Sequence, residues 1–400
     1  MSGRPPSIHE GAGEIPPVIR DVPGQESAVA FLVPAAARPH HAYLFIGPEG
    51  SGKRIGMRAL TAALLCSRGG CGECRDCRLA MGERHPNMLV LEPGGPDILV
   101  GKDGSDPNTA RWFVSRAYLT PPEPGRKVMV VVQADRLRIE AADVLLKVLE
   151  DPPRDTIFIL LSARPDDLPE TIRSRCQEIS FPPLPEDFVV DVLMREGVNE
   201  TRAKLAARLA GGNVGRARRM ARDDRELAFR DAALDAARAA RGGRGAALRS
   251  AEELLSAAKA FRASLGDELQ GELEPFLDER GRPQEPFRAV VRRLTEQHER
   301  RLRRAEREFL DLALMSLTAY FRDVAAIGSG VGTDVLINID LPVAGDASSW
   351  TSAEAALAMG AVEEARADLA DETNLNARLV LERVFLRLAE AGSVSAAPAK

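Results

Sequence analysis

The 400-residue sequence has no apolar run of about 18 residues, the length that a membrane-spanning helix needs. Its first residues are polar and proline-bearing, without the apolar core of a secretory signal. We therefore expect a soluble, cytoplasmic protein with no membrane partner. A basic excess is also missing, because 54 Lys and Arg stand against 59 Asp and Glu and the net charge is -5. This balance argues against a function dominated by direct contacts with DNA phosphates.

Cysteine is scarce, with five in the chain, and four of the five lie close together with the spacing C-x4-C-x2-C-x2-C. This clustering fits a reducing compartment and a metal better than disulfides. Four thiolates at such spacing can close a tetrahedral Zn²⁺ site and leave no coordination position open. We predict a structural zinc ion in an insertion at 66–77, bound by Cys66, Cys71, Cys74 and Cys77. The alternative is a reduced cysteine cluster on a loop.

A glycine-rich turn follows the short apolar segment 43–46 and has the Walker A pattern. Its backbone N–H groups can surround a phosphate, while a lysine reaches the outer phosphates. The pattern asks next for Ser or Thr, whose hydroxyl binds Mg²⁺, and this chain has Arg54 instead, which could offset phosphate charge. We expect ATP or ADP, unless the turn is a relic that binds nothing. The expected nucleotide-binding residues are Gly47, Pro48, Glu49, Gly50, Ser51, Gly52, Lys53, Arg54 and, at the end of a later strand, Ser162.

The carboxylates that ATP hydrolysis requires are missing after the apolar run 128–132, which has the character of a central parallel strand. In a P-loop hydrolase this strand ends in one or two carboxylates that hold the metal and activate water. Here Val132 and Gln133 occupy these positions, and neither accepts a proton. Asp135 comes two or three residues late, and we expect it to cap a helix over 135–151. Hydrolysis by this chain should be severely reduced.

Strands and helices alternate over residues 20–182 and then the strands stop, which predicts a three-layer α/β domain with a parallel sheet followed by all-α domains. Within 299–307 glutamates are interleaved with arginines and no aromatic residue alternates with them, so we expect a solvated, ion-paired face. The expected parts are a flexible arm at 1–20, a nucleotide-binding module at 21–182, a helical lid at 183–243, a helical oligomerisation domain at 244–391 and a disordered tail at 392–400.

Residues 22–182 resemble the AAA+ module of bacterial clamp loaders. The likeness rests on Gly24-Gln25, the phosphate loop, the four-cysteine insertion, the segment 145–153 and Ser174-Arg175-Cys176. Within this family the chain is most similar to the delta-prime subunits, because the gamma/tau pattern ends the central strand in Asp-Glu. The segments 320–323 and 376–382 also resemble the collar domain of delta-prime subunits, which extends the likeness over most of the chain.

The resemblance implies a stator subunit of the DNA polymerase III clamp loader, a heteropentamer with gamma/tau and delta subunits. Such a complex, part of a nucleotidyltransferase holoenzyme, uses ATP to load a sliding clamp onto primed template DNA. Carried over, Arg175 would be an arginine finger that acts in trans on a neighbour's nucleotide. Its alternative role is a salt bridge that holds a helix end. We expect Cys176 to be buried packing, because no obvious histidine base accompanies it.

Two other classes of function remain as alternatives. The first is an ATP-hydrolysing motor of the gamma/tau kind or an autonomous P-loop enzyme, and the missing carboxylates weigh against it. The second is a zinc-dependent nucleic-acid reader. Arg68, Arg75 and Arg78 would supply positive charge near the cysteines, but the cysteine segment contains no aromatic side chain on which a base could stack.

Overall fold

The computed structural model describes residues 15–95, 97–278, 280–285, 287–341, 343, 350–370 and 376–394. The chain divides into two compact units, Met1–Arg195 with Gly211–Arg216 and Glu196–Ala210 with Ala217–Lys400. Each unit is described by itself below. The division into arm, module, lid, oligomerisation domain and tail stays a prediction.

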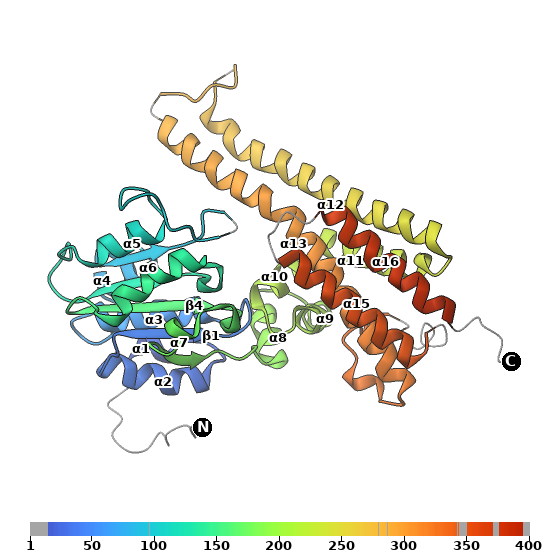
Figure 1. Ribbon diagram of the computed structural model, residues 1–400, viewed down its shortest axis with the longest axis horizontal. Coiled ribbons are helices and arrows are strands. Elements are labelled where there is room, and N and C mark those ends of the chain that lie inside the picture. Colours follow the sequence, from blue (N-terminus) through green and yellow to red (C-terminus); the bar gives the residue numbers. More distant parts are fainter. Residues whose placement is uncertain are drawn as a thin grey trace. The chain divides into compact units, whose positions relative to one another are not determined.

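The first unit contains a five-stranded parallel sheet in the order β2-β3-β4-β1-β5 (Figure 1). The register pairs Ile46 with Ser162 on one side and with Ser180 on the other, so these three strands end at the same level. The central strands β3 and β4 are buried along their whole length, as expected for a parallel sheet that helices cover on both faces, whereas the edge strand β5 is mostly exposed. Their bounds are β1 Ala42–Ile46, β2 Met88–Leu91, β3 Lys127–Val131, β4 Thr156–Ser162 and β5 Gln177–Ser180.

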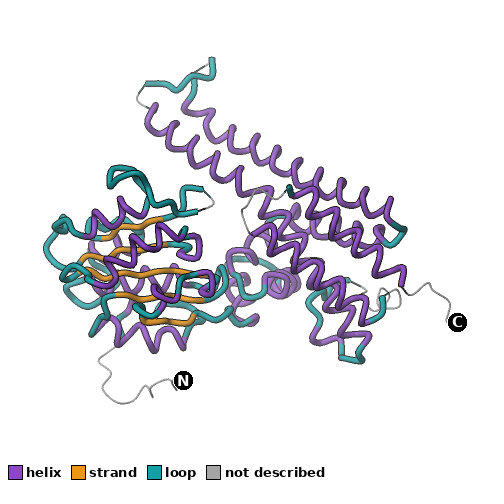
Figure 2. The backbone as a smooth tube through the Cα atoms, in the orientation of Figure 1, coloured by secondary structure: helices purple, strands orange, loops and turns teal. Residues whose placement is uncertain are grey.

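Helices cover both faces of this sheet (Figure 2). Because side chains alternate along a strand, Tyr43 and Phe45 of β1 enter one apolar cluster and Leu44 enters another. The first cluster includes Leu60 of α3 and the second Leu145 of α6. The helices are α1 Pro17–Arg20, α2 Glu26–Ala37, α3 Lys53–Leu65, α4 Arg75–Met81, α5 Ala110–Ala117, α6 Ile139–Glu150, α7 Glu170–Arg173 and α8 Glu186–Arg195, with 3-10 turns η1 Ala134–Arg136 and η2 Pro165–Asp167. The predicted fold class is confirmed in its architecture, an α/β module with a parallel sheet and a glycine-rich loop between β1 and α3, followed by helical parts.

The helix predicted over 135–151 is wrong at its start. Residues 134–136 form η1, and α6 begins only at Ile139. Leu137 between them is extended, because it forms an isolated parallel bridge with Ile98. Asp135 therefore does not cap α6. Its carboxylate instead accepts a hydrogen bond from the backbone N–H of Ala163, at 3.1 Å.

Two terminal predictions also need correction. The arm predicted at 1–20 does not extend through its last residues, because α1 forms there and buries Val18 and Ile19 against the sheet's helices. Residues 1–14 lie outside the described part of the chain. At the other end, α16 runs from Ala377 to Val394, so the first three residues of the tail predicted at 392–400 belong to this helix. Residues 395–400 lie outside the described residues.

Helices are the regular elements of the second unit in the residues that the structure describes, apart from an isolated bridge between Leu277 and Pro283. Its elements are α9 Glu200–Ala210, α10 Val214–Arg222, whose first turn falls in the first unit, α11 Asp224–Ala240, α12 Arg244–Leu273, η3 Glu274–Phe276, α13 Arg288–Gly328, η4 Thr333–Val335, α15 Ser352–Ala370 and α16 Ala377–Val394. One apolar core joins α11, the first half of α12, the second half of α13, α15 and α16. Of the helices described in both units, none combines the length and the apolar character needed to cross a bilayer.

The distal halves of α12 and α13 form a hairpin beyond this core, side by side in Figure 1. In the first half of α13, the residues whose side chains the structure describes as buried are Val291, His298 and Ala305, which are seven positions apart, the spacing of a two-helix seam. Leu269 is the buried residue on the facing part of α12, and Nε2 of His298 lies 3.1 Å from a carboxylate oxygen of Glu272. The sequence did not predict the break between these two helices.

A buried polar network fixes the segment that follows α13. The carboxylate of Asp323, fully buried, accepts hydrogen bonds from the backbone N–H groups of Ile337 and Asn338, at 3.0 and 2.8 Å. The buried guanidinium of Arg230 on α11 donates to the side chains of Asn338 and Asp340, at 2.9 and 2.7 Å. Polar side chains thus replace apolar packing where this segment crosses the helices.

Candidate functional site

The phosphate loop connects the end of β1 to the start of α3 and requires glycine at two positions by close approach. A Cβ atom at Gly47 would lie 2.0 Å from the carbonyl oxygen of Phe181, and one at Gly50 would lie 2.1 Å from Cγ of Asn213. Gly50 also has a φ of +77°, which side chains rarely adopt. The loop therefore packs tightly on its neighbours. Its last glycine, Gly52, directly precedes α3, whose first turn has backbone N–H groups that can bind a phosphate.

The ammonium group of Lys53 lies inside the phosphate loop. Nζ donates to the carbonyl oxygens of Gly47 and Pro48, at 2.5 and 2.7 Å. Burial lowers the pKa of Lys53 to about 8, although the charges of Glu49 and Asp135 offset part of this effect. The arrangement offers a partly desolvated cation beside the loop backbone, which is the chemistry that binds phosphate.

Arg54 does not face the loop as the sequence analysis suggested. Its Nε donates to Glu83 at 2.5 Å and its Nη2 lies 2.6 Å from an Oε1 atom of Glu92. The hydrogen bond with Glu83 is the main reason that the pKa of Arg54 is raised, and Arg58 also binds Glu83, at 2.6 Å. With its charge committed to two carboxylates, Arg54 is poorly placed to offset the charge of a phosphate.

The end of the central strand lacks a carboxylate in the structure as in the sequence. Val132 and Gln133 follow β3, and Gln133 adopts a left-handed conformation with φ of 55°. Ser162, buried at the end of β4, accepts a hydrogen bond at Oγ from Arg164 N–H, at 3.1 Å, and its carbonyl accepts one from Gly47 N–H, at 3.2 Å. Ser162 therefore touches the loop by its backbone.

Sequence reasoning missed two residues of this site. The side chain of Asp135 is buried and lies 3.7 Å from Nε of Arg164, and its charge offsets a small part of the lowering of the Lys53 pKa that burial causes. The sequence could have indicated this residue, because Asp135 is the first carboxylate after the central strand. Gln25 is also buried, and its Nε2 donates to Ser51 O at 2.6 Å and to Pro182 O at 2.8 Å. Gln25 Oε1 and Ser51 Oγ have no hydrogen-bond partner among the described residues, which fits a polar ligand beside the loop.

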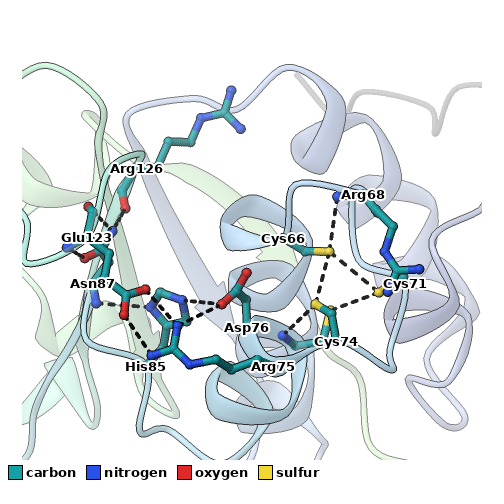
Figure 3. Close-up of polar contacts among 11 residues, drawn as sticks. Cys66, Arg68, Cys71, Cys74, Arg75, Asp76, His85, Asn87, Glu123 and Arg126 are labelled. Carbon is teal, nitrogen blue, oxygen red and sulfur yellow. Dashed lines mark hydrogen bonds and ion pairs between the residues drawn. The ribbon is translucent and has the colours of Figure 1, made fainter.

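The four predicted zinc ligands converge, as Figure 3 shows for three of them. Sγ of Cys66 lies 3.8 Å from Sγ of Cys71 and 3.6 Å from Sγ of Cys74. The Sγ atoms of Cys71 and Cys77 are 4.0 Å apart. Four sulfurs bound at about 2.3 Å to one tetrahedral ion are about 3.8 Å apart. The observed spacing therefore matches a tetrahedral metal site without rearrangement.

Backbone N–H groups donate to these sulfurs, and at Cys66 they favour the ionised form. Arg68 N donates to Cys66 at 3.3 Å, and Gly72 N donates to Cys77 at 3.4 Å. Burial opposes ionisation of Cys66, but hydrogen bonds from the backbone of Cys71 and its neighbours outweigh burial and lower its pKa to about 6. Burial raises the pKa of Cys77. Thiolates are the form that binds zinc, so this shell suits a metal.

A polar network next to the cysteines ties α4 to the loop before β3 (Figure 3). Arg75 donates to both carboxylate oxygens of Glu123, at 2.8 and 3.2 Å. The side-chain amide of Asn87 donates to the carbonyl oxygen of Glu123 and accepts a hydrogen bond from its backbone N–H. Asp76, His85 and Glu123 also converge, but Nδ1 of His85 accepts the N–H of Asn87, so Nε2 carries the hydrogen. That nitrogen faces Asp76 at 3.6 Å as a donor and does not suit a metal.

Arg175 lies directly after α7 and makes contacts within its own chain. Its Nη2 lies 2.6 Å from Oε1 of Glu150, at the end of α6, and its Nη1 donates to Thr171 O at 2.8 Å. These contacts match the salt bridge that the sequence analysis kept as an alternative. Burial, followed by the charge of Glu178, raises the pKa of Cys176 to about 12, so this thiol is neutral packing rather than a nucleophile.

Part of the chain is similar to known proteins. Residues 24–185 match the family described as DNA polymerase III, delta subunit. The chain is 33% identical over 190 residues to DNA polymerase III subunit delta' of Bacillus subtilis (strain 168), covering 47% of this chain and 55% of that protein. It is 37% identical over 187 residues to the Escherichia coli (strain K12) subunit delta', covering 46% and 54%.

A gamma/tau subunit is also similar. The chain is 34% identical over 213 residues to DNA polymerase III subunit gamma/tau of Mycobacterium tuberculosis (strain ATCC 25618 / H37Rv), covering 50% of this chain and 35% of that protein. The chain thus spans about half the length of the delta' relatives that it matches and less of the gamma/tau relative. The similarity concerns the sheet-bearing part, where the loop, the cysteines and Arg175 lie.

Proposed function

Because residues 24–185 match the family described as DNA polymerase III, delta subunit, we propose that this protein is a delta-prime-type subunit of a cytoplasmic clamp loader. In this role it assembles with gamma/tau and delta subunits in a heteropentamer and helps to load the sliding clamp onto primed DNA at the expense of ATP. Contacts with the clamp and with primer-template DNA are made through the complex.

The observation that carries this proposal is a phosphate loop with intact backbone and no catalytic metal or base chemistry. Lys53 lies within the loop, but Arg54 replaces the metal-binding hydroxyl and is held by Glu83 and Glu92. Val132 and Gln133 stand where a hydrolase has carboxylates. Bound ATP or ADP would be contacted by the loop N–H groups and Lys53, and a bound phosphate would supply the negative charge that this cation lacks. The chain's own ATPase should be weak or absent, which separates it from a gamma/tau-like motor or an autonomous P-loop enzyme.

Arg175 is the residue that we assign to catalysis in trans. Its side chain is about one-third exposed at the end of α7, on a rigid helix terminus. An arginine that reaches the γ-phosphate of a neighbouring gamma/tau subunit stabilises the charge of the transition state, an effect of about 10³ to 10⁵ in rate. The chain thus completes an active site that it does not itself contain.

The test is reconstitution of the full chain with gamma/tau and delta subunits, followed by DNA-stimulated ATPase. Arg175→Ala should lower the rate while the ring still forms. Arg154→Ala, an exposed arginine in the loop after α6, is the matched control and should leave the rate unchanged. A wild-type rate with Arg175→Ala would exclude the finger, and a failure of the wild-type chain to join the ring would exclude the whole proposal.

We also propose that Cys66, Cys71, Cys74 and Cys77 hold a structural zinc ion. The sulfur spacing and the surrounding N–H donors support it. When bound, the ion cross-links the end of α3 to α4 and performs no chemistry. Metal analysis should find one zinc per wild-type chain and none for Cys71→Ser, with Cys176→Ser as the control that keeps its zinc. One equivalent of zinc in Cys71→Ser would contradict the assignment.

A further inference from the structure

The guanidinium of Arg175 is held at both terminal nitrogens. Nη2 is 2.6 Å from Glu150 Oε1, while Nη1 donates to the carbonyl of Thr171 at 2.8 Å and lies 3.4 Å from Oγ of Ser174. Thr171 and Ser174 belong to the same helical turn as Arg175, whereas Glu150 comes from α6, a different element. Glu150 is therefore the contact that fixes the direction of the side chain relative to the rest of the unit.

These contacts leave part of the guanidinium for another partner. An arginine has five N–H donors in a fixed planar arrangement. The three contacts among the described residues use three of them, and 35% of the side chain is exposed. Two donors on one rigid plane remain for an anion. An arginine held in this way presents a defined edge instead of sampling many rotamers.

We infer that Glu150 is a positioning residue for Arg175, orienting its free donors toward the nucleotide of the neighbouring subunit. This inference rests on the proposed function. The alternative is a latch in which Glu150 withholds Arg175 until the ring assembles. Both side chains are substantially exposed, at 35% and 47%, and an ion pair of this kind shifts an equilibrium by no more than about fivefold. That is too little to withhold an arginine from an effect of about 10³ to 10⁵.

The experiment uses the full chain in the reconstituted ring and measures the part of the DNA-stimulated ATPase that Arg175→Ala removes. Glu150→Gln, which keeps the shape of the side chain, should lower kcat for this part by about three- to tenfold, the range for losing the order of one long side chain. The KM for ATP should stay unchanged. Glu150→Asp should restore half or more of the loss, because it returns the charge. Glu170→Gln removes an exposed carboxylate of α7 that makes none of the contacts described for Arg175, and should match wild type.

The double variant Glu150→Gln, Arg175→Ala separates positioning from a structural role. It should be no slower than Arg175→Ala alone, because Glu150 acts only through Arg175. A further loss on the Arg175→Ala background would overturn the inference, as would a Glu150→Gln ring that fails to form in gel filtration. A faster Glu150→Gln enzyme would establish the latch instead.

The two proposals fail in different ways. If Arg175→Ala lowers the rate and Glu150→Gln behaves as wild type, the positioning role is refuted and the finger stands. If Arg175→Ala itself has no effect, the finger is refuted and the role of Glu150 falls with it.

Discussion

At the scale of single residues, Gly50 is the position where the phosphate loop tolerates least change. Gly50 and Gly69 both have positive φ, +77° and +67°, so alanine should strain either by about 1 kcal/mol. Only at Gly50 would the new Cβ displace Asn213, whose side chain accepts the N–H of Arg216 at the start of α10, a cap that is worth about 1 kcal/mol. Nothing lies within 4 Å of a Cβ at Gly69.

We predict that Gly50→Ala lowers the unfolding free energy of the first unit by about 2 kcal/mol and Gly69→Ala by about 1 kcal/mol. Denaturant titration of the two variants beside wild type measures both. On an Asn213→Ala background the cost of Gly50→Ala should approach that of Gly69→Ala. An equal cost for the two glycines in the wild-type background would show that Asn213 moves aside freely.

Lys53 gives the loop a pH-dependent stability. Its pKa falls from 10.5 to about 8 on folding, because of burial. Between these values the folded chain has released the proton that the unfolded chain still binds, so stability rises with pH across this window. Lys53→Met removes the titrating group. We predict that the unfolding free energy of wild type, measured against Lys53→Met without nucleotide, increases from pH 7.5 to pH 10, and a difference that is constant or falls with pH would contradict this.

At the scale of elements, the sequence predicted what short-range pattern controls. The apolar runs of β1 to β4 and the start of α3 at Lys53 follow from their own residues and neighbours. The error at Asp135 arose from a distant contact, the bridge between Ile98 and Leu137 that delays α6. Side-chain partners were invisible for the same reason, since Gln25 binds Pro182 from 157 residues away.

The break between α12 and α13 is a different kind of omission, because its signal was in the sequence. Pro275, Gly281 and Pro283 interrupt an otherwise helical stretch, and the residues from Glu274 to Phe287 contain the turn. The sequence analysis gave more weight to the charged, helix-favouring residues on both sides than to these turn-forming residues. The resulting hairpin pairs residues that a single long helix would have kept far apart.

The segment after α13 depends on one buried carboxylate. Asp323→Ala would leave the N–H groups of Ile337 and Asn338 buried without their acceptor, at a cost of about 3 kcal/mol or more. Asp311, on the same helix, pairs with Arg366 near the surface, and Asp311→Ala should cost about 1 kcal/mol or less. Denaturant unfolding of both variants tests the contrast, and similar costs would mean that the segment adapts to the loss.

At the scale of the whole molecule, each unit has its own hydrophobic interior. Phe158 lies in the sheet's core and Phe385 in the core of the helical unit, and both are fully buried. Phe→Ala at either position should destabilise its own unit by about 3 to 5 kcal/mol. Hydrogen exchange of the full chain, followed by peptide mass analysis, should show faster exchange confined to the unit that carries the substitution. Equal acceleration in both units would show that they unfold together.

The pairing of Arg54 with Glu83 and Glu92 has a consequence for engineering hydrolysis into this loop. Replacing Arg54 with threonine would supply the hydroxyl that magnesium needs, but it would leave Glu92 without this partner and Glu83 with Arg58 alone. Val132 and Gln133 would still lack the carboxylates. A hydrolytic site is therefore not reachable by one substitution, because the residue at the hydroxyl position is itself part of an ion-pair network that the substitution would break.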